Sequence, residues 1–249
     1  MAITAPTYRA INQTLVTSNA SVSPPLPTGW AQDDIVIVAI AQTNNASEPA
    51  FTDPSGWTYL GNQPMVGVPS AATNLRIDCW WRRMQSGDVA AAFANGVANA
   101  KFATTIAFIG CHGAGSGQAT SPIDFNSAGS DTAVGTNWSI AAGSTSFDNS
   151  MMVYQLATEA ASTTAPITTA ANTTLASVNV PYNTAFSTNN GNGRAQVYGV
   201  CATAGSTGTL TGTRASGYGV SYHIALRGVD GGGGGTVLGG RTSLLGVGL

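Results

Sequence analysis

The segment from Asp33 to Ala41 constrains the fold of this chain more than any other stretch. It reads Asp-Asp-Ile-Val-Ile-Val-Ala-Ile-Ala, a short apolar run rich in β-branched residues, with Gly29-Trp30 before it and several polar residues after it. A run of this length between turn-forming residues is typical of a strand buried on both faces rather than of a helix. We expect the other strands to pack around it, with the two aspartates capping the entry turn and keeping that strand end in water.

The rest of the chain has the pattern of short strands separated by turns. Leu75, Ile77 and Cys79 alternate with Arg76 and Asp78, which predicts a half-buried strand over residues 74–84. We expect an edge strand within residues 1–23 and further strands over residues 57–60, 101–110, 138–140, 150–157, 178–180, 184–186, 194–200 and 220–228.

The segments between these strands have the residues of turns and loops. The prolines of residues 23–30 lack backbone donors, so this segment is not a central strand. Asp53-Pro54-Ser55-Gly56 predicts a β-turn with proline at its second position. Residues 89–100 are alanine-rich and allow at most a helical turn, and residues 110–135 have the glycine and serine content of a long loop. Together these patterns predict an all-β fold, a β-sandwich of the jelly-roll type.

Composition limits the classes of partner. Charged residues make up 8% of the 249 residues and the net charge is -2, whereas a typical protein is roughly a quarter charged. Phosphate binding needs clustered cations, and Arg82-Arg83 is the single basic doublet, so we expect no nucleic-acid binding. No apolar run approaches the ~20 residues of a membrane helix, and residues 1–10 lack the pattern of a signal peptide. We therefore expect a chain that is made in the cytoplasm and has no membrane contact.

The sequence contains no recognisable cofactor or metal motif. Cys79, Cys111 and Cys201 are odd in number and widely spaced, with no Cys-x-x-Cys or Cys/His cluster, so we expect no zinc site. Small buried thiols are the favoured interpretation, and one disulfide with one free thiol is the alternative. No phosphate-binding loop, EF-hand or dinucleotide fingerprint is present, so we expect no cofactor.

The titratable residues do not form a catalytic pattern along the sequence. His112 lies at a predicted strand end and His223 alternates with apolar residues, which favours structural roles, and we expect no enzymatic activity. A glycosidase carboxylate pair stays an alternative because such pairs meet only in the fold. Turn and capping roles account for nearly all of the aspartates: Asp33, Asp34, Asp53, Asp78, Asp88, Asp124, Asp131 and Asp148.

Aromatic residues are the candidate binding residues. Adjacent Trp80 and Trp81 must face opposite sides of a regular strand, so we expect one in the core and the other at an interface or on the surface. Trp57 and Trp138 complete the set that could stack on a sugar. Packing in a core or subunit interface is the favoured role, with sugar binding as the alternative.

The C-terminal end differs from the rest of the chain. Gly231 to Gly235 form an uninterrupted glycine run, which is typical of a flexible linker. We therefore divide the chain into a β-sandwich domain, 1–230, and a glycine-rich, apolar tail, 231–249. We expect the tail to dock on a neighbouring subunit through Leu244, Leu245, Val247 and Leu249.

A series of short motifs resembles one class of known proteins. Pro27-Thr28-Gly29-Trp30 leads into Asp33-Asp34-Ile35, Pro54-Ser55-Gly56-Trp57 follows, then Trp81-Arg82-Arg83 before Ser86-Gly87-Asp88, and Ile224-Ala225-Leu226-Arg227-Gly228-Val229 closes the series. In this order, over about residues 25–230, the motifs resemble β-sandwich structural proteins of tailed bacteriophages.

The resemblance implies a non-enzymatic virion protein. Such a protein would decorate or stabilise the capsid or tail surface through contacts with copies of itself and with other virion proteins, after synthesis in the host cytoplasm. The alternative is a host-binding module of a phage tail or fibre that recognises a cell-surface glycan through its aromatic residues.

Overall fold

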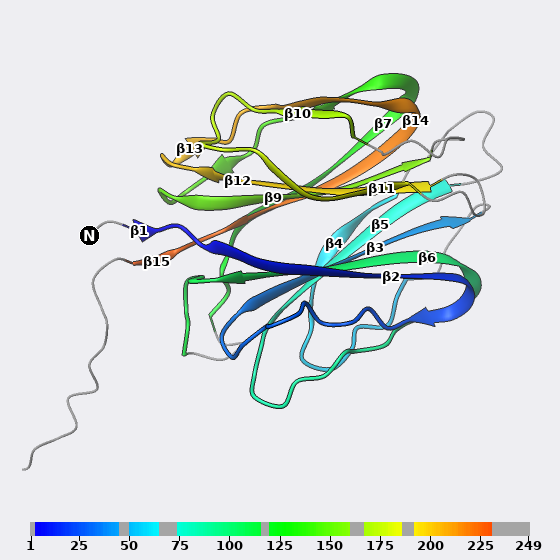
Figure 1. Ribbon diagram of the computed structural model, residues 1–249, viewed down its shortest axis with the longest axis horizontal. Coiled ribbons are helices and arrows are strands. Elements are labelled where there is room, and N and C mark those ends of the chain that lie inside the picture. Colours follow the sequence, from blue (N-terminus) through cyan, green and yellow to red (C-terminus); the bar gives the residue numbers. More distant parts are fainter. Residues whose placement is uncertain are drawn as a thin grey trace, which may run out of the picture.

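The computed structural model describes residues 3–44, 50–64, 74–115, 120–159, 167–185 and 192–230, which form two antiparallel sheets packed face to face (Figure 1). The first sheet has the order β2-β6-β3-β5-β4, and the second has the order β14-β9-β12-β11, with β7 and β10 both paired to β14. Short pairs β1–β15 and β8–β13 lie beside them. The strands are β1 (Ile3–Thr4), β2 (Thr7–Val22), β3 (Ile35–Asn44), β4 (Thr58–Pro64), β5 (Asn74–Arg83), β6 (Phe93–Ile109), β7 (Ile123–Ile140), β8 (Ser144–Thr145), β9 (Ser150–Glu159), β10 (Thr169–Ala171), β11 (Asn179–Ala185), β12 (Asn192–Cys201), β13 (Gly205–Ser206), β14 (Leu210–Leu226) and β15 (Val229–Asp230).

The predicted β-sandwich is confirmed. Its connections differ from the two Greek keys of a jelly roll, because the first sheet takes β2 to β6 and the second takes β7 to β14. Each half of the chain therefore forms one sheet. Figure 1 shows this division as a lower sheet coloured blue to green and an upper sheet coloured green to orange.

The two halves have the same topology. The first sheet runs β2-β6-β3-β5-β4 and the second runs β7-β14-β9-β12-β11, so each strand of the first sheet has a counterpart at the same place in the second, which has β10 in addition. The paired strands also agree in length: β3 and β9 have 10 residues each, β4 and β11 have 7, β5 and β12 have 10, and β6 and β14 have 17. The fold is therefore an internal structural repeat.

Two backbone positions support this repeat independently. Asp33 and Asn149 are the two non-glycine residues with positive φ in the described chain, at 69° and 55°, and they lie just before β3 and β9. The backbone N–H of Asp33 donates to Met84 O at 2.9 Å and that of Asn149 donates to Ala202 O at 3.2 Å. Met84 and Ala202 directly follow β5 and β12, so the same left-handed turn opens the central strand of each sheet.

Three apolar layers hold the sandwich together. The middle layer lies between the sheets and takes alternate residues of the central strands of both, including Ile37, Ile106, Val153 and Ile224, all fully buried. The residues between these positions face outward into a second layer under the first sheet, with Val38 and Trp80, and a third over the second sheet. The segment Ile35–Ala41 is thus buried on both faces, as predicted.

Two segments that were expected to be a helical turn or a loop belong to long strands instead. Residues 93–100, in the segment expected to allow at most a helical turn, belong to β6, where they pair with the end of β2. Residues 123–135, expected in a long loop, belong to β7, which pairs with β14 along nearly its whole length. Glycine, serine and alanine lower the apolar periodicity of these stretches, but a long partner strand still supplies their backbone hydrogen bonds.

Two aspartates are more deeply buried than the sequence pattern predicts. The strand β5 is not half-buried, because Asp78 is fully buried opposite its apolar face. Asp34 is fully buried as well, so it does not keep the strand end in water. Its carboxylate does cap the entry turn, accepting the Ala31 N–H at 2.8 Å and pairing with Arg9 at 2.6 Å.

The turn at residues 53–56 is shifted by one position. The Trp57 N–H donates to Pro54 O at 3.0 Å, so proline opens the turn instead of taking its second position. The Trp30 N–H donates to Pro27 O at 3.2 Å in the same way. Gly29 and Gly56, with φ of 72° and 78°, supply the left-handed residue that both Pro-x-Gly-Trp turns need.

Candidate functional site

All four candidate tryptophans are buried in the apolar layers of the chain. Trp80 is fully buried under the first sheet, where its Nε1 donates to Asp53 at 2.8 Å, and Trp81 is buried between the sheets. They face opposite sides, as predicted, but neither lies on the surface of the chain, which corrects the expectation for the second ring. Trp57 packs edge-on against Phe93 in the outer layer under the first sheet, with centroids 5.5 Å apart.

Trp138 has a different environment. It lies near the end of β7, where β7 and β14 together bend over the outer face of the second sheet (Figure 1). A Cβ atom on Gly219 would lie 2.4 Å from the Trp138 ring, so this glycine provides the space for the indole. The guanidinium of Arg214 lies 4.6 Å from the ring centroid on another side, a cation–π geometry. These contacts hold the indole in one orientation.

A cavity of about 210 Å³ lies beside Trp138 on the outer face of the second sheet. Its inner wall consists of the buried residues Trp138, Ile140, Ser221 and His223, and its rim includes the exposed residues Ser130 and Ala142. The cavity is smaller than the roughly 300 Å³ of the smallest drug-sized pockets. None of its lining residues is an aspartate, glutamate, lysine or arginine.

His223 is the titratable group of this cavity. Its side chain stacks on Phe125 with centroids 5.3 Å apart and meets Tyr154 edge-on at 5.8 Å. Both ring nitrogens are buried and have no hydrogen-bond partner among the residues that the structure describes. Burial lowers the pKa of His223 from 6.5 to about 4, because the charged imidazolium would lose its hydration. The imidazole is therefore neutral at pH 7, with one donor and one acceptor nitrogen.

His112, the other histidine, lies elsewhere, in the segment after β6. Its Nε2 is 3.4 Å from Arg227, and partial burial together with that cation lowers its pKa. The two histidines therefore do not form one site.

The carboxylates form separate ion pairs. Asp78 pairs with Arg76 at 2.6 Å and accepts the Tyr59 hydroxyl, and burial raises the pKa of this carboxyl group. Asp88 pairs with Arg82, and Asp34 with Arg9. Each of these carboxylates is thus engaged with a different arginine. Among the residues that the structure describes, no group of three or more His, Cys, Asp and Glu side chains could hold a metal ion.

A buried polar cluster lies between the sheets around Arg194 of β12. Its Nη2 donates to Thr104 Oγ1 at 2.8 Å, to Gln155 Oε1 at 3.3 Å and to Ala39 O at 3.4 Å. Gln196 Nε2 donates to the same Thr104 and Gln155 oxygens at 2.8 and 2.5 Å. Within the described part of the chain Nε and Nη1 of Arg194 have no partner, and burial lowers the pKa of Arg194 to about 10. Sequence reasoning missed this cluster, because residues of four strands meet in it only in the fold.

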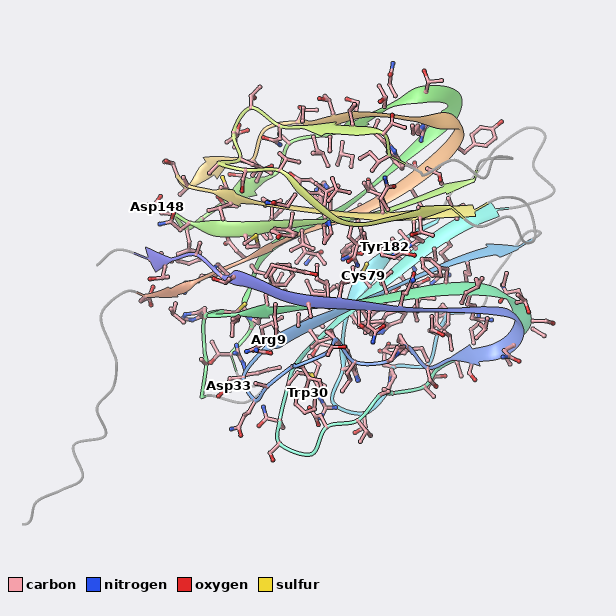
Figure 2. All side chains as sticks on the ribbon, viewed as in Figure 1. Arg9, Trp30, Asp33, Cys79, Asp148 and Tyr182 are labelled. Atoms are coloured by element: carbon pink, nitrogen blue, oxygen red, sulfur yellow. The ribbon has the colours of Figure 1, made fainter. Side chains whose placement is uncertain are left out.

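The three cysteines are free and buried, as the sequence favoured. Cys79 lies between the sheets (Figure 2), where burial raises the pKa of its thiol. Burial likewise raises the pKa of the Cys111 thiol to about 12. These thiols therefore act as small apolar side chains.

Comparison with known proteins found no counterpart: no family model, no curated protein and no solved structure matches this chain. None of the described residues forms a helix that could span a membrane. The predicted tail anchors Leu244, Leu245, Val247 and Leu249 lie outside the described residues.

Proposed function

We propose that this chain is a non-enzymatic structural protein of a tailed-bacteriophage particle, which decorates or stabilises the capsid or tail surface through contacts between subunits. The β-sandwich fold, the motif series and the low content of charged residues support the proposal. Three buried apolar layers make the described chain a self-contained unit, so further contacts are left to its edges.

The main support for the proposal is the edge strand β2. It has 16 residues and pairs with β6 along one side, and within the described chain no strand pairs with its other side. Native proteins commonly protect such edges with lysine, proline or short strands. Here the single charged residue of β2 is Arg9, which is held by Asp34, and residues 17–21 are exposed and uncharged. A long neutral edge favours strand addition from another subunit.

The positions of the tryptophans also favour a structural role over glycan recognition. Trp57, Trp80, Trp81 and Trp138 are all buried in cores of the chain, and of the four Trp138 alone lines the cavity on the outer face of the second sheet. The host-glycan alternative therefore rests on Trp138 and its cavity, which can be tested separately.

The proposal is tested by the mass of the purified protein in solution, measured by light scattering across a concentration series. We expect the full-length chain to be oligomeric. The double substitution Ser18→Lys with Ala20→Lys places two charges on the exposed edge and should shift the protein toward monomer. The matched control, Ala202→Lys with Ala204→Lys, adds the same charge at exposed positions after β12 and should leave the mass unchanged.

A second experiment distinguishes association through the edge strand β2 from association through the C-terminal tail. A chain truncated after Asp230 lacks residues 231–249, and loss of association on truncation would assign the main contact to the tail. A full-length chain that stays monomeric at every concentration and does not bind purified phage particles would contradict the proposal.

A further inference from the structure

The cavity beside Trp138 has a counterpart in the other half of the chain. Comparison of the two places shows that the second half lacks the chain segment that covers the equivalent residues in the first. In the register of the two sheets, Ser127 of β7 pairs with His223 of β14, and Asn12 of β2 pairs with Thr105 of β6. Both pairs lie on the outer face of their sheet, at the same place in the repeat. The chain therefore contains two versions of this site, one in each half, which can be compared directly.

In the first half the site is filled by the chain itself. The proline-rich segment after β2 crosses over the pair, and its carbonyl groups complete the hydrogen bonds. Thr105 Oγ1 donates to Pro25 O at 2.7 Å, and Asn12 Nδ2 donates to Leu26 O at 3.2 Å. The polar side chains of this outer face thus have partners from the covering segment.

In the second half the covering segment is shorter and takes another course. Residues 141–149 connect β7 to β9, against residues 23–34 in the first half. They turn aside to form β8, which pairs with β13, and Gly143 N donates to Thr207 Oγ1 at 2.8 Å. Phe125 and Tyr154 occupy part of the space, and the cavity is what remains. The imidazole of His223, unlike the Thr105 hydroxyl, has no hydrogen-bond partner in the described segments.

The chemistry of the cavity wall indicates the class of ligand. Beside its apolar residues the lining has the hydroxyl groups of four serines and one imidazole, each of which can both donate and accept a hydrogen bond, and the Ser221 hydroxyl already donates to Gly129 O at 3.3 Å. A hydroxyl group of a ligand can likewise both donate and accept a hydrogen bond, whereas a carbonyl group of a ligand can only accept one. A charged ligand would lose its hydration in the cavity. Because this lining has no charged side chain, no ion pair would offset that loss. The indole of Trp138 adds an apolar wall.

The size of the cavity narrows the ligand further. Its 210 Å³ correspond to about seven water molecules at ~30 Å³ each, which is the scale of one sugar ring and not of an oligosaccharide. We propose that the cavity lined by Ser127, Trp138, Ser221 and His223 binds a single neutral pyranose unit. The nitrogens of His223 are covered in the empty cavity, so the proposed contact of the imidazole with a ligand hydroxyl requires the ring to turn when the sugar enters. This inference does not depend on subunit assembly.

The test is a titration of the folded full-length protein with neutral methyl pyranosides (the glucoside, galactoside, mannoside and N-acetylglucosaminide), observed by saturation-transfer NMR. We expect one of them to bind with a Kd on the order of 1 mM, a value usual for few hydrogen bonds in an open site. Binding should also shift the ring signals of His223. Ser127→Phe fills the cavity and should weaken binding by at least about tenfold. Thr136→Phe, at an exposed position of the same strand outside the cavity, should leave it unchanged.

The other outcomes each count against the proposal. No response to any of the four glycosides would overturn it, as would a response that persists in a folded Ser127→Phe protein. Equal binding of a glucuronide would contradict selection for a neutral ring. A synthetic peptide of residues 23–30, the segment that covers the equivalent site, serves as a rival probe. Binding of this peptide in place of the glycosides would assign the cavity to a polypeptide.

Discussion

At the scale of single residues, Arg194 is a buried cation that lies between the two sheets. It is fully buried, its hydrogen-bond partners are three neutral oxygens, and two of its nitrogens have no partner. A buried cation without a carboxylate loses its hydration and gains little in return. The polar groups around it do not depend on it, because Gln196 also donates to Thr104 and to Gln155.

We therefore predict that Arg194→Met raises the free energy of unfolding by about 1–3 kcal/mol, the range found when buried ionic groups are replaced by apolar ones. Urea denaturation at pH 7 measures the change. Arg194→Lys keeps the charge but loses the planar donor group, and it should lower the stability. A destabilised Arg194→Met protein would mean that the guanidinium has a partner or a role that its contacts do not account for.

His223 makes stability depend on pH. Its pKa is lowered to about 4 in the folded chain against 6.5 for an exposed histidine, so the unfolded state binds more protons between these values. Stability from this residue is therefore complete above pH 6.5 and is lost as the pH falls toward 4, by about 3 kcal/mol in total. Urea denaturation between pH 4 and 7 should show this loss, and His223→Phe should remove it. His112→Gln, at a partly exposed histidine, serves as the control and should retain most of it.

At the scale of elements, β12 packs closely against the backbone of residues 175–178, where the Ala176 N–H donates to Val200 O at 2.8 Å. Residues 175–178 run so close to Gly199 that an added Cβ atom would lie 2.1 Å from Ser177 O. We predict that Gly199→Ala lowers the free energy of unfolding by about 2–3 kcal/mol, since backbone must move to admit the methyl group. Gly129→Ala is the matched control: its Cβ would meet the Ser221 hydroxyl at 3.0 Å, and a hydroxyl can turn away. Equal losses for both variants would contradict this account.

Elements with a strong apolar pattern were predictable, and those whose residues are small were not. Ile35 to Ala41 could be assigned from sequence because buried β-branched residues have no common alternative to a strand. The strand β7 could not, because its serines and glycines resemble a loop and its pairing is decided by β14, far along the chain. The cavity depends on β7, so the sequence singled out Trp138 and His223 but gave no signal for Ser127 or Ser221 beside them.

The internal repeat was equally hidden. The clearest trace in the sequence is the agreement of Ile106-Ala107 and Gly110 with Ile224-Ala225 and Gly228 at the ends of β6 and β14. Elsewhere the halves preserve the size and burial of side chains but not their identity, as where Val38 and Tyr154 both face an outer layer. Many apolar residues satisfy the same buried position, so topology is retained while the sequences diverge.

At the scale of the whole molecule, the repeat forms one folding unit and not two domains. Each half supplies one sheet, and the middle apolar layer takes residues from both: Ile37 and Ile106 from the first, Val153 and Ile224 from the second. Tyr222 of β14 also donates its hydroxyl to Leu60 O of β4 at 2.6 Å. A half without its partner would expose one whole apolar sheet face, which a soluble chain rarely tolerates.

We therefore predict that fragments 1–115 and 116–249 do not fold alone but combine when mixed into a 1:1 complex. Trp81 lies in the middle layer, so its fluorescence emission should shift to shorter wavelength on mixing, and size-exclusion chromatography should give one peak of the summed mass. A first fragment carrying Ile106→Asp places a carboxylate in that layer and should not combine, because burying an unpaired charge costs several kcal/mol. Cooperative unfolding of either fragment by itself would show instead that each sheet is stabilised by its own outer layer, and residues 1–230 would then contain two domains.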